Sequence, residues 1–195
     1  MGDSSAGRPT DLPSMRGGAA LAIALLMLVI SGVAAASVSA NQTPASRAPK
    51  TAMAALEDAV VARINQVRSR RGLRPLRASR RLAAAADFHS RDMGRRGYFE
   101  HDSANGTVFW RRIERFYSSS GFRSWTVGEN LLWASDSYGA AYAVREWMQS
   151  PPHRQNILSR DWREVGIGAV YFAAAPGEYR GRSVTILTAD FGART

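Results

Sequence analysis

The chain of 195 residues contains no cysteine, so neither disulfides nor cysteine-bound metals can hold its fold together. An apolar core has to supply the stability instead. Residues 41–195 are numerous enough to bury such a core within one domain. A cysteine nucleophile is excluded for the same reason.

An uncharged, apolar segment near the N-terminus has the composition of an export signal. Residues 17–46 carry no charge, residues 21–30 are all apolar, and Arg16 precedes them. A short positive region, an apolar stretch of this length and small residues after it are the parts of a secretory signal peptide. The tripeptide Val38-Ser39-Ala40 predicts cleavage after Ala40, so residues 1–40 are interpreted as the signal peptide. Translation from Met15 would give a signal of more usual length.

The alternative is a membrane anchor that is not removed. Residues 19–38 are just long enough to span a bilayer if Ser31 and Gly32 are tolerated within it. Under either interpretation we expect the domain to be exported, to an extracellular or periplasmic location.

The rest of the chain is expected to form one domain behind a short linker. Residues 41–52 contain Pro44 and Pro49 among small polar residues and are interpreted as the linker. The domain itself is expected over residues 53–195.

Helices are predicted in the first part of the domain and strands at its end. The third helix is expected to turn Ala141, Val144 and Trp147 or Met148 inward, and Pro176-Gly177-Glu178 predicts that the two strands pair in antiparallel fashion. In chain order the predicted elements are helices from Met53 to near Gly72, from the N-cap Ser79 to the C-cap Gly97 and from Ser137 to Ser150-Pro151-Pro152, then strands at 165–172 and 183–191.

Three histidines are available to any chemistry that needs an imidazole, and none lies in a standard catalytic or metal-binding motif. His89 shares a helix face with apolar residues and is interpreted as structural. His101 follows a helix end and two aromatic rings, and His153 follows two prolines that fix its backbone. Glu129 stands between a glycine and an apolar strand, which is an unusual setting for a surface acid.

Five sequence blocks together resemble a known family. The blocks are Phe88-His89-Ser90-Arg91-Asp92-Met93, Tyr98-Phe99-Glu100-His101, Gly128-Glu129-Asn130-Leu131, residues 147–158 (WMQSPPHRQNIL) and Glu164-Val165-Gly166-Ile167-Gly168. In this order they resemble the CAP superfamily, also called the SCP domain, in its cysteine-free bacterial form. The resemblance covers residues 53–192.

The resemblance implies an α+β fold, a three-layer α/β/α sandwich with a small antiparallel sheet between helices and a cleft on one side. In that family the cleft holds two histidines and two glutamates that can bind a divalent metal, often zinc. The positions that match are His101, Glu129 and His153, which the resemblance implies as metal ligands. The second glutamate has no counterpart, because Ser150 occupies its position and Glu146 would point in another direction on a helix.

These three side chains allow two interpretations. Two neutral imidazoles and one carboxylate would leave a zinc ion an open position for water, whose pKa the ion could lower enough for hydrolysis. Alternatively, the three groups form a hydrogen-bonded polar cluster that shapes the cleft. Since no obvious nucleophile or general base accompanies them in the sequence, catalytic residues are not assigned.

The net charge of +10 belongs to the part after the signal and comes almost entirely from arginine. No stacking-aromatic motif or recognition helix accompanies these residues, so a solvated face, or attraction to an anionic lipid surface or envelope polymer, is favoured over nucleic acid. The arginines that crowd the end of the first helix and the start of the second are Arg68, Arg70, Arg71, Arg74, Arg77, Arg80 and Arg81.

From these observations we expect an exported, monomeric binding module rather than an enzyme. Its cleft would take a divalent metal, zinc above all, and a small apolar or lipid-like ligand. One alternative is a metal-dependent hydrolase acting on peptides or cell-envelope material. Another is a cell-surface interaction protein with a vestigial cleft, in which the arginines make the contacts.

Overall fold

The computed structural model describes residues 48–135 and 138–195. The predicted signal peptide, the first part of the predicted linker and Ser137 lie outside these residues. Among the described helices, none is long and apolar enough to cross a membrane. In chain order the elements are α1 (Ala48–Ser69), β1 (Arg77–Ala78), α2 (Arg80–Arg96), α3 (Phe109–Glu114), β2 (Trp125–Ser135), α4 (Ala140–Gln149), α5 (Pro151–Leu158), β3 (Glu164–Phe172), a 3-10 turn (Gly177–Tyr179) and β4 (Val184–Arg194).

The first two helices follow the predicted pattern closely. Helix α1 begins at Ala48, earlier than the predicted Met53. Pro49 permits this start, because it falls in the first helical turn, where its missing N–H costs no hydrogen bond. Helix α2 starts directly after Ser79 and ends at Gly97, whose φ of 74° is the left-handed conformation that glycine adopts readily. The face of α2 predicted to point inward is buried: Leu82, Ala86, His89 and Met93.

The middle of the chain departs from the prediction. The short helix α3 was not predicted, because six residues give too little periodicity to recognise. In α4 the prediction that Ala141 faces inward is wrong: it is exposed, because the buried stripe runs through Ala143, Val144 and Trp147. After Ser150 the chain begins a new helix, α5, with proline in its first turn.

A four-stranded sheet in the order β1-β3-β4-β2 lies at the centre of the domain. Strands β3 and β4 pair in antiparallel fashion, as predicted, and β4 pairs in the same way with β2. The short β1 runs parallel to β3 and pairs only with Glu164 and Val165. Beyond Val165, no strand among the described residues covers the outer edge of β3.

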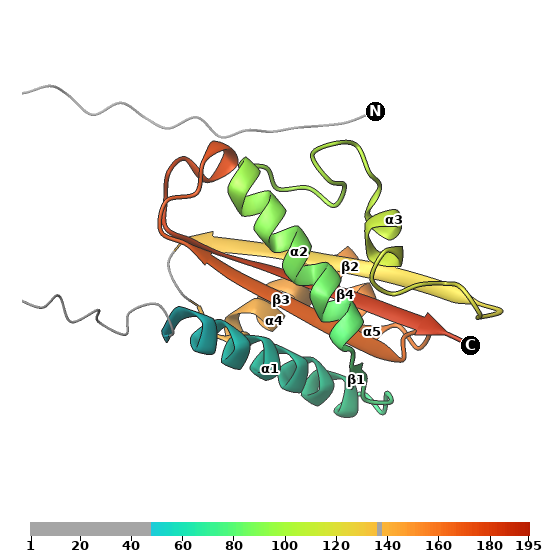
Figure 1. Ribbon diagram of the computed structural model, residues 1–195. Helices are drawn as coiled ribbons and strands as arrows, with labels where there is room; N and C mark the ends of the chain where they lie inside the picture. The colour runs from blue at the N-terminus through green and yellow to red at the C-terminus, as the bar shows by residue number, and fades with distance from the viewer. Residues whose placement is uncertain (1–47, 136–137) are drawn as a thin grey trace, which may run out of the picture. The chain divides into compact units, whose positions relative to one another are not determined.

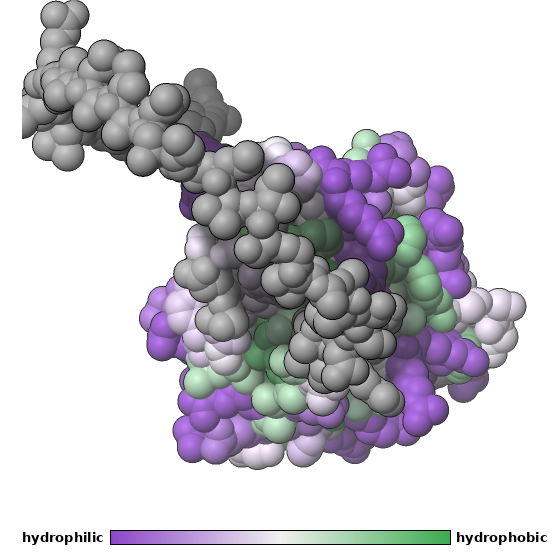
Figure 2. Space-filling view, turned by 60° about the vertical axis from the view of Figure 1, so that its left-hand side comes forward, coloured by the Kyte–Doolittle hydropathy of each residue, from purple (hydrophilic) through white to green (hydrophobic). Residues whose placement is uncertain are grey.

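Helices cover both faces of this sheet (Figure 1), which confirms the α/β/α sandwich. Helices α2 and α3 lie on one face, and α1, α4 and α5 on the other. At the end of the domain where α1 begins, hydrophobic side chains gather between hydrophilic ones (Figure 2).

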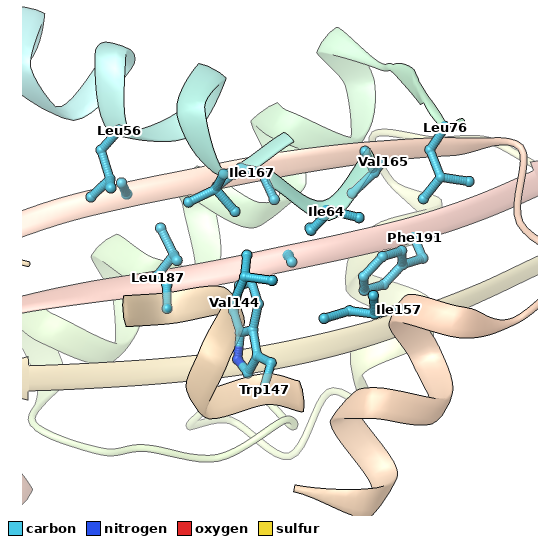
Figure 3. Packing of buried hydrophobic residues seen from close by; sticks show 14 of the residues in the cluster. Leu56, Ile64, Leu76, Val144, Trp147, Ile157, Val165, Ile167, Leu187 and Phe191 are labelled. Carbon is cyan, nitrogen blue, oxygen red and sulfur yellow. The ribbon is translucent and has the colours of Figure 1, made fainter. Parts of the chain in front are cut away.

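The main core fills the space between the sheet and helices α1, α4 and α5 (Figure 3). Ile64 from α1, Val144 and Trp147 from α4, and Phe191 from β4 all belong to it. On the opposite face, glycines let α2 approach the sheet closely, since a Cβ atom at Gly168 would lie 2.1 Å from the backbone nitrogen of Asp87. This close contact sets how near α2 lies to the sheet.

Candidate functional site

Two of the predicted site residues touch each other directly. Glu129 lies within β2, and its Oε1 accepts a hydrogen bond of 2.8 Å from Nδ1 of His101, in the loop after α2. The Glu129 side chain is 1% exposed, whereas that of His101 is 50% exposed. Because a carboxylate can only accept, Nδ1 of His101 carries the proton, and Nε2 of this half-exposed ring is its unprotonated nitrogen when the ring is neutral.

Arg112 is one of the residues that sequence reasoning missed at this site. It lies in α3, is 1% exposed, and its guanidinium forms a buried ion pair with Oε2 of Glu129. Arg112 Nη1 also donates a 2.7 Å hydrogen bond to the backbone carbonyl of His101. One arginine therefore holds both Glu129 and the loop of His101 in place.

Asp190 brings a second carboxyl group to the base of the site. It lies on β4 directly opposite Glu129 and is fully buried. Burial first, and then the negative charge of Glu129, raise the pKa of Asp190 well above its usual range, while Arg112 acts in the opposite direction. No described donor reaches its two oxygens, but a protonated Asp190 can itself donate to Glu129. An acid inside the apolar run of the last predicted strand was the signal that could have revealed it.

His153 reaches the same region from α5. Asn130, the neighbour of Glu129 on β2, donates a 3.0 Å hydrogen bond to the His153 backbone carbonyl. Asn156, one turn further along α5, donates to the carbonyl of Glu129 at 3.0 Å and to the side chain of Asn130 at 2.8 Å. Burial, and then the charge of His101, lower the pKa of His153, so the two imidazoles interact electrostatically.

The three predicted ligands are not equally available to a metal ion. Both oxygens of Glu129 are engaged, one by His101 and the other by Arg112. Within residues 48–135 and 138–195, no group of three or more histidine, aspartate or glutamate side chains is arranged to hold an ion. His101 and His153 are the groups that could still bind one, and Glu129 stands behind His101, where carboxylates orient metal-binding imidazoles in other proteins.

The position of the family's second glutamate carries no acid in this structure. Ser150 lies between α4 and α5, capping the end of one and the start of the other. Glu146 interacts instead with its neighbour Arg145 at 3.1 Å. Neither residue supplies a carboxylate to His101.

His89 is a structural residue, as predicted. It is fully buried, and its Nε2 donates a 2.9 Å hydrogen bond to the backbone carbonyl of Glu100. Its Nδ1 has no partner among the described residues. Burial is the main reason why its pKa falls to about 4, with the charge of Arg112 acting in the same direction and those of Glu129 and Asp92 opposing it.

The pKa of His89 predicts that acid destabilises the fold. Between pH 6.5 and about 4 the unfolded chain binds a proton at His89 that the folded protein does not, so stability is complete above this range and is lost within it. We expect lowering the pH from 7 to 4 to cost the wild type about 3 kcal/mol more than a His89→Gln variant. Urea unfolding of both proteins at the two pH values measures this difference. An equal pH dependence in both would contradict it.

The predicted arginine surface needs one correction, because Arg68 is not part of a solvated face. It is buried, and its Nη1 donates 2.8 Å hydrogen bonds to the carbonyls of Ile157 and Ser159. Its Nε donates to the carbonyl of Arg74. Arg68 therefore joins α1 to the end of α5. The others of that group are exposed: Arg70, Arg71, Arg74, Arg77, Arg80 and Arg81.

Comparison with known sequences gives similarity to two proteins of Bacillus subtilis (strain 168). The uncharacterized protein YkwD is 33% identical over 144 residues, which are 67% of this chain and 53% of YkwD. The uncharacterized membrane protein YlbC is 31% identical over 104 residues, which are 53% of this chain and 28% of YlbC. The chain thus spans about half the length of YkwD and less of YlbC.

Comparison with solved structures gives similarity to bacterial proteins of the same architecture. An extracellular protein containing an SCP domain, from Bacillus anthracis str. Ames, has a TM-score of 0.60 at 27% identity over 75% of this chain and 43% of that one. An outer surface protein of Borrelia burgdorferi has a TM-score of 0.50 at 20% identity over 70% of this chain and 90% of that one, and shares the fold. A model of the cysteine-rich secretory protein family matches residues 61–188, and the chain therefore belongs to this family, the CAP family.

Proposed function

We propose that this protein is an exported CAP-family binding domain whose site holds a divalent metal ion, zinc above all, between the imidazoles of His101 and His153. The observation that carries the proposal is the hydrogen bond from His101 Nδ1 to buried Glu129. It fixes the tautomer and orientation of a half-exposed ring, which is what a metal-binding histidine needs.

The protonation state of His153 supports the same role. A histidine binds metal only as a neutral imidazole, so a lowered pKa keeps the ligand available at neutral pH. Burial and the neighbouring His101 both lower the pKa of His153. The ion, when bound, would act as a Lewis acid at the surface of the domain.

The polar groups around the imidazoles favour binding over hydrolysis. Glu129 is paired with Arg112, so its carboxylate is not free to take a proton from water. Asp190 is buried, and its raised pKa favours the protonated form. Within residues 48–135 and 138–195, therefore, neither of these two acids is a free base that could support the hydrolase hypothesis.

Export is part of the proposal and draws support from two sources. Residues 1–40 have the pattern of a signal peptide. Similar structures are described as an extracellular protein and an outer surface protein. N-terminal sequencing of the protein secreted by its natural host should give Asn41 as the first residue.

Isothermal titration with zinc tests the metal site. We expect the wild type to bind zinc, the His101→Ala/His153→Ala double variant to lose this binding, and Glu129→Gln to bind roughly 10–100-fold more weakly, because the carboxylate no longer orients His101. Glu178→Gln, an exposed residue of the β3–β4 connection, is the matched control and should bind like the wild type. Equal zinc affinity in the wild type and the double variant would refute the site.

A further inference from the structure

A cavity of about 480 Å³ opens between α1, α2 and β3. None of His101, Glu129 and His153 lines it, so it is separate from the site described above. Its volume lies within the range of small-molecule pockets. Its apolar wall includes Met53, Ala54, Ala83, Ala84, Val170 and Tyr171.

The sheet topology explains why space remains there. Strand β1 ends at Ala78, so no strand among the described residues covers β3 from Ile167 onward, and α1 and α2 flank this edge from opposite faces of the sheet. The helices present alanines toward the gap, which fill little of it. Tyr171 at the end of β3 is 43% exposed, an unusual exposure for a large aromatic ring. The hydrophobic surface in Figure 2 lies at the end of the domain where α1 begins.

One carboxylate in the cavity forms no direct ion pair among the described residues. Glu57 of α1 accepts a 2.8 Å hydrogen bond from the backbone N–H of Ala169, but it forms no ion pair with any described residue. Arg91 could have neutralised it, yet its guanidinium is held by Asp87 through two hydrogen bonds of 2.8 Å. Burial is the main reason why the pKa of Glu57 is raised, and the negative charges of Asp87 and Asp58 act in the same direction. The hydrogen bond from Ala169 and, as the smallest contribution, the charge of Arg91 oppose this rise. A positive group entering the cavity would therefore find a carboxylate that no described residue pairs with directly.

We propose that this cavity is a second binding site, which takes a ligand made of an aliphatic chain and an ammonium group, with the ammonium paired to Glu57 and the chain lying along the apolar wall. Charge selects this class of ligand. Arg91 also lines the cavity, but its charge is paired with Asp87, so Glu57 leaves the lining with one excess negative charge. A fatty acid would bring its carboxylate next to this charge, where like charges repel. A neutral alcohol of the same length would bury the same apolar area but leave Glu57 without a counter-ion.

Three probes of equal chain length separate these possibilities: n-octylamine, 1-octanol and octanoate, titrated into the purified full-length protein. We expect octylamine to bind at least tenfold more tightly than either of the others. Glu57→Gln keeps the acceptor for Ala169 N–H, so it should fold normally, bind octanol as before and lose the preference for the amine. Glu178→Gln, an exposed acid outside the cavity, should keep that preference.

A variant that fills the cavity tests its location. Ala84→Phe, at an exposed position of α2, should weaken all three probes without unfolding the protein, as checked by circular dichroism. The proposal is overturned if octanoate binds best, if the amine preference survives in Glu57→Gln, or if Ala84→Phe leaves octylamine binding unchanged. It is also overturned if sedimentation shows that the protein forms a dimer in the absence of any probe and that Ala84→Phe abolishes this dimer. In that case a second copy of the chain, and not a small ligand, covers the cavity.

Discussion

Replacing Arg112 by alanine is expected to lower the free energy of unfolding by about 3–5 kcal/mol. The guanidinium is the positive group that pairs with Glu129 and offsets the negative charge around Asp190, and both acids are buried. Removing it leaves an uncompensated carboxylate in a site that water cannot reach. Urea unfolding monitored by tryptophan fluorescence measures the loss.

Two further variants separate the buried charge from other effects. Arg111→Ala removes the neighbouring arginine, which is exposed and stacks on Trp110, and should cost less than about 1 kcal/mol. The double variant Arg112→Met/Glu129→Gln removes both charges and should recover part of the stability lost in Arg112→Ala. If Arg112→Ala unfolds at the same urea concentration as the wild type, the buried ion pair has no structural role.

Replacing Trp147 by alanine is expected to cost about 3–5 kcal/mol. The side chain is 1% exposed and belongs to the main core, where it lies beside Val144 of α4 (Figure 3). The substitution leaves a cavity among well-packed neighbours and also removes the 2.9 Å hydrogen bond from Trp147 Nε1 to the carbonyl of Leu131.

Controls at two positions test this explanation. Trp147→Phe keeps most of the volume and should recover more than half of the loss. Trp110→Ala removes a tryptophan that is 39% exposed, and should change stability by less than about 1 kcal/mol. Equal effects of the alanine substitutions at positions 110 and 147 would contradict the assignment of Trp147 to the core.

Elements with strong local signals could be predicted from the sequence. Helix α2 has an apolar face of regular spacing between Ser79 and Gly97, so both its length and its ends were correct. The pair β3 and β4 was predicted because β-branched residues lie on both sides of a turn. Ala141 was assigned to the wrong face because a small residue fits both a buried and an exposed position.

The charged part of the site required the tertiary structure. Arg112 lies in a six-residue helix beside another arginine, and nothing in its local sequence distinguishes the buried one from the exposed one. Arg68 was grouped with exposed arginines for the same reason, although it is buried. The pairing of Asp190 with Glu129 depends on the register of β2 with β4, which spacing along the chain does not determine.

The rings of His101 and His153 are proposed to bind one metal ion together. The most direct measurement is long-range ¹H–¹⁵N NMR of the imidazole nitrogens during titration with zinc. We predict that resonances of both rings change together and saturate at one zinc per protein, while Nδ1 of His101 keeps the proton that it shares with Glu129. A response limited to one ring, or no response from either at one equivalent of zinc, would contradict the account.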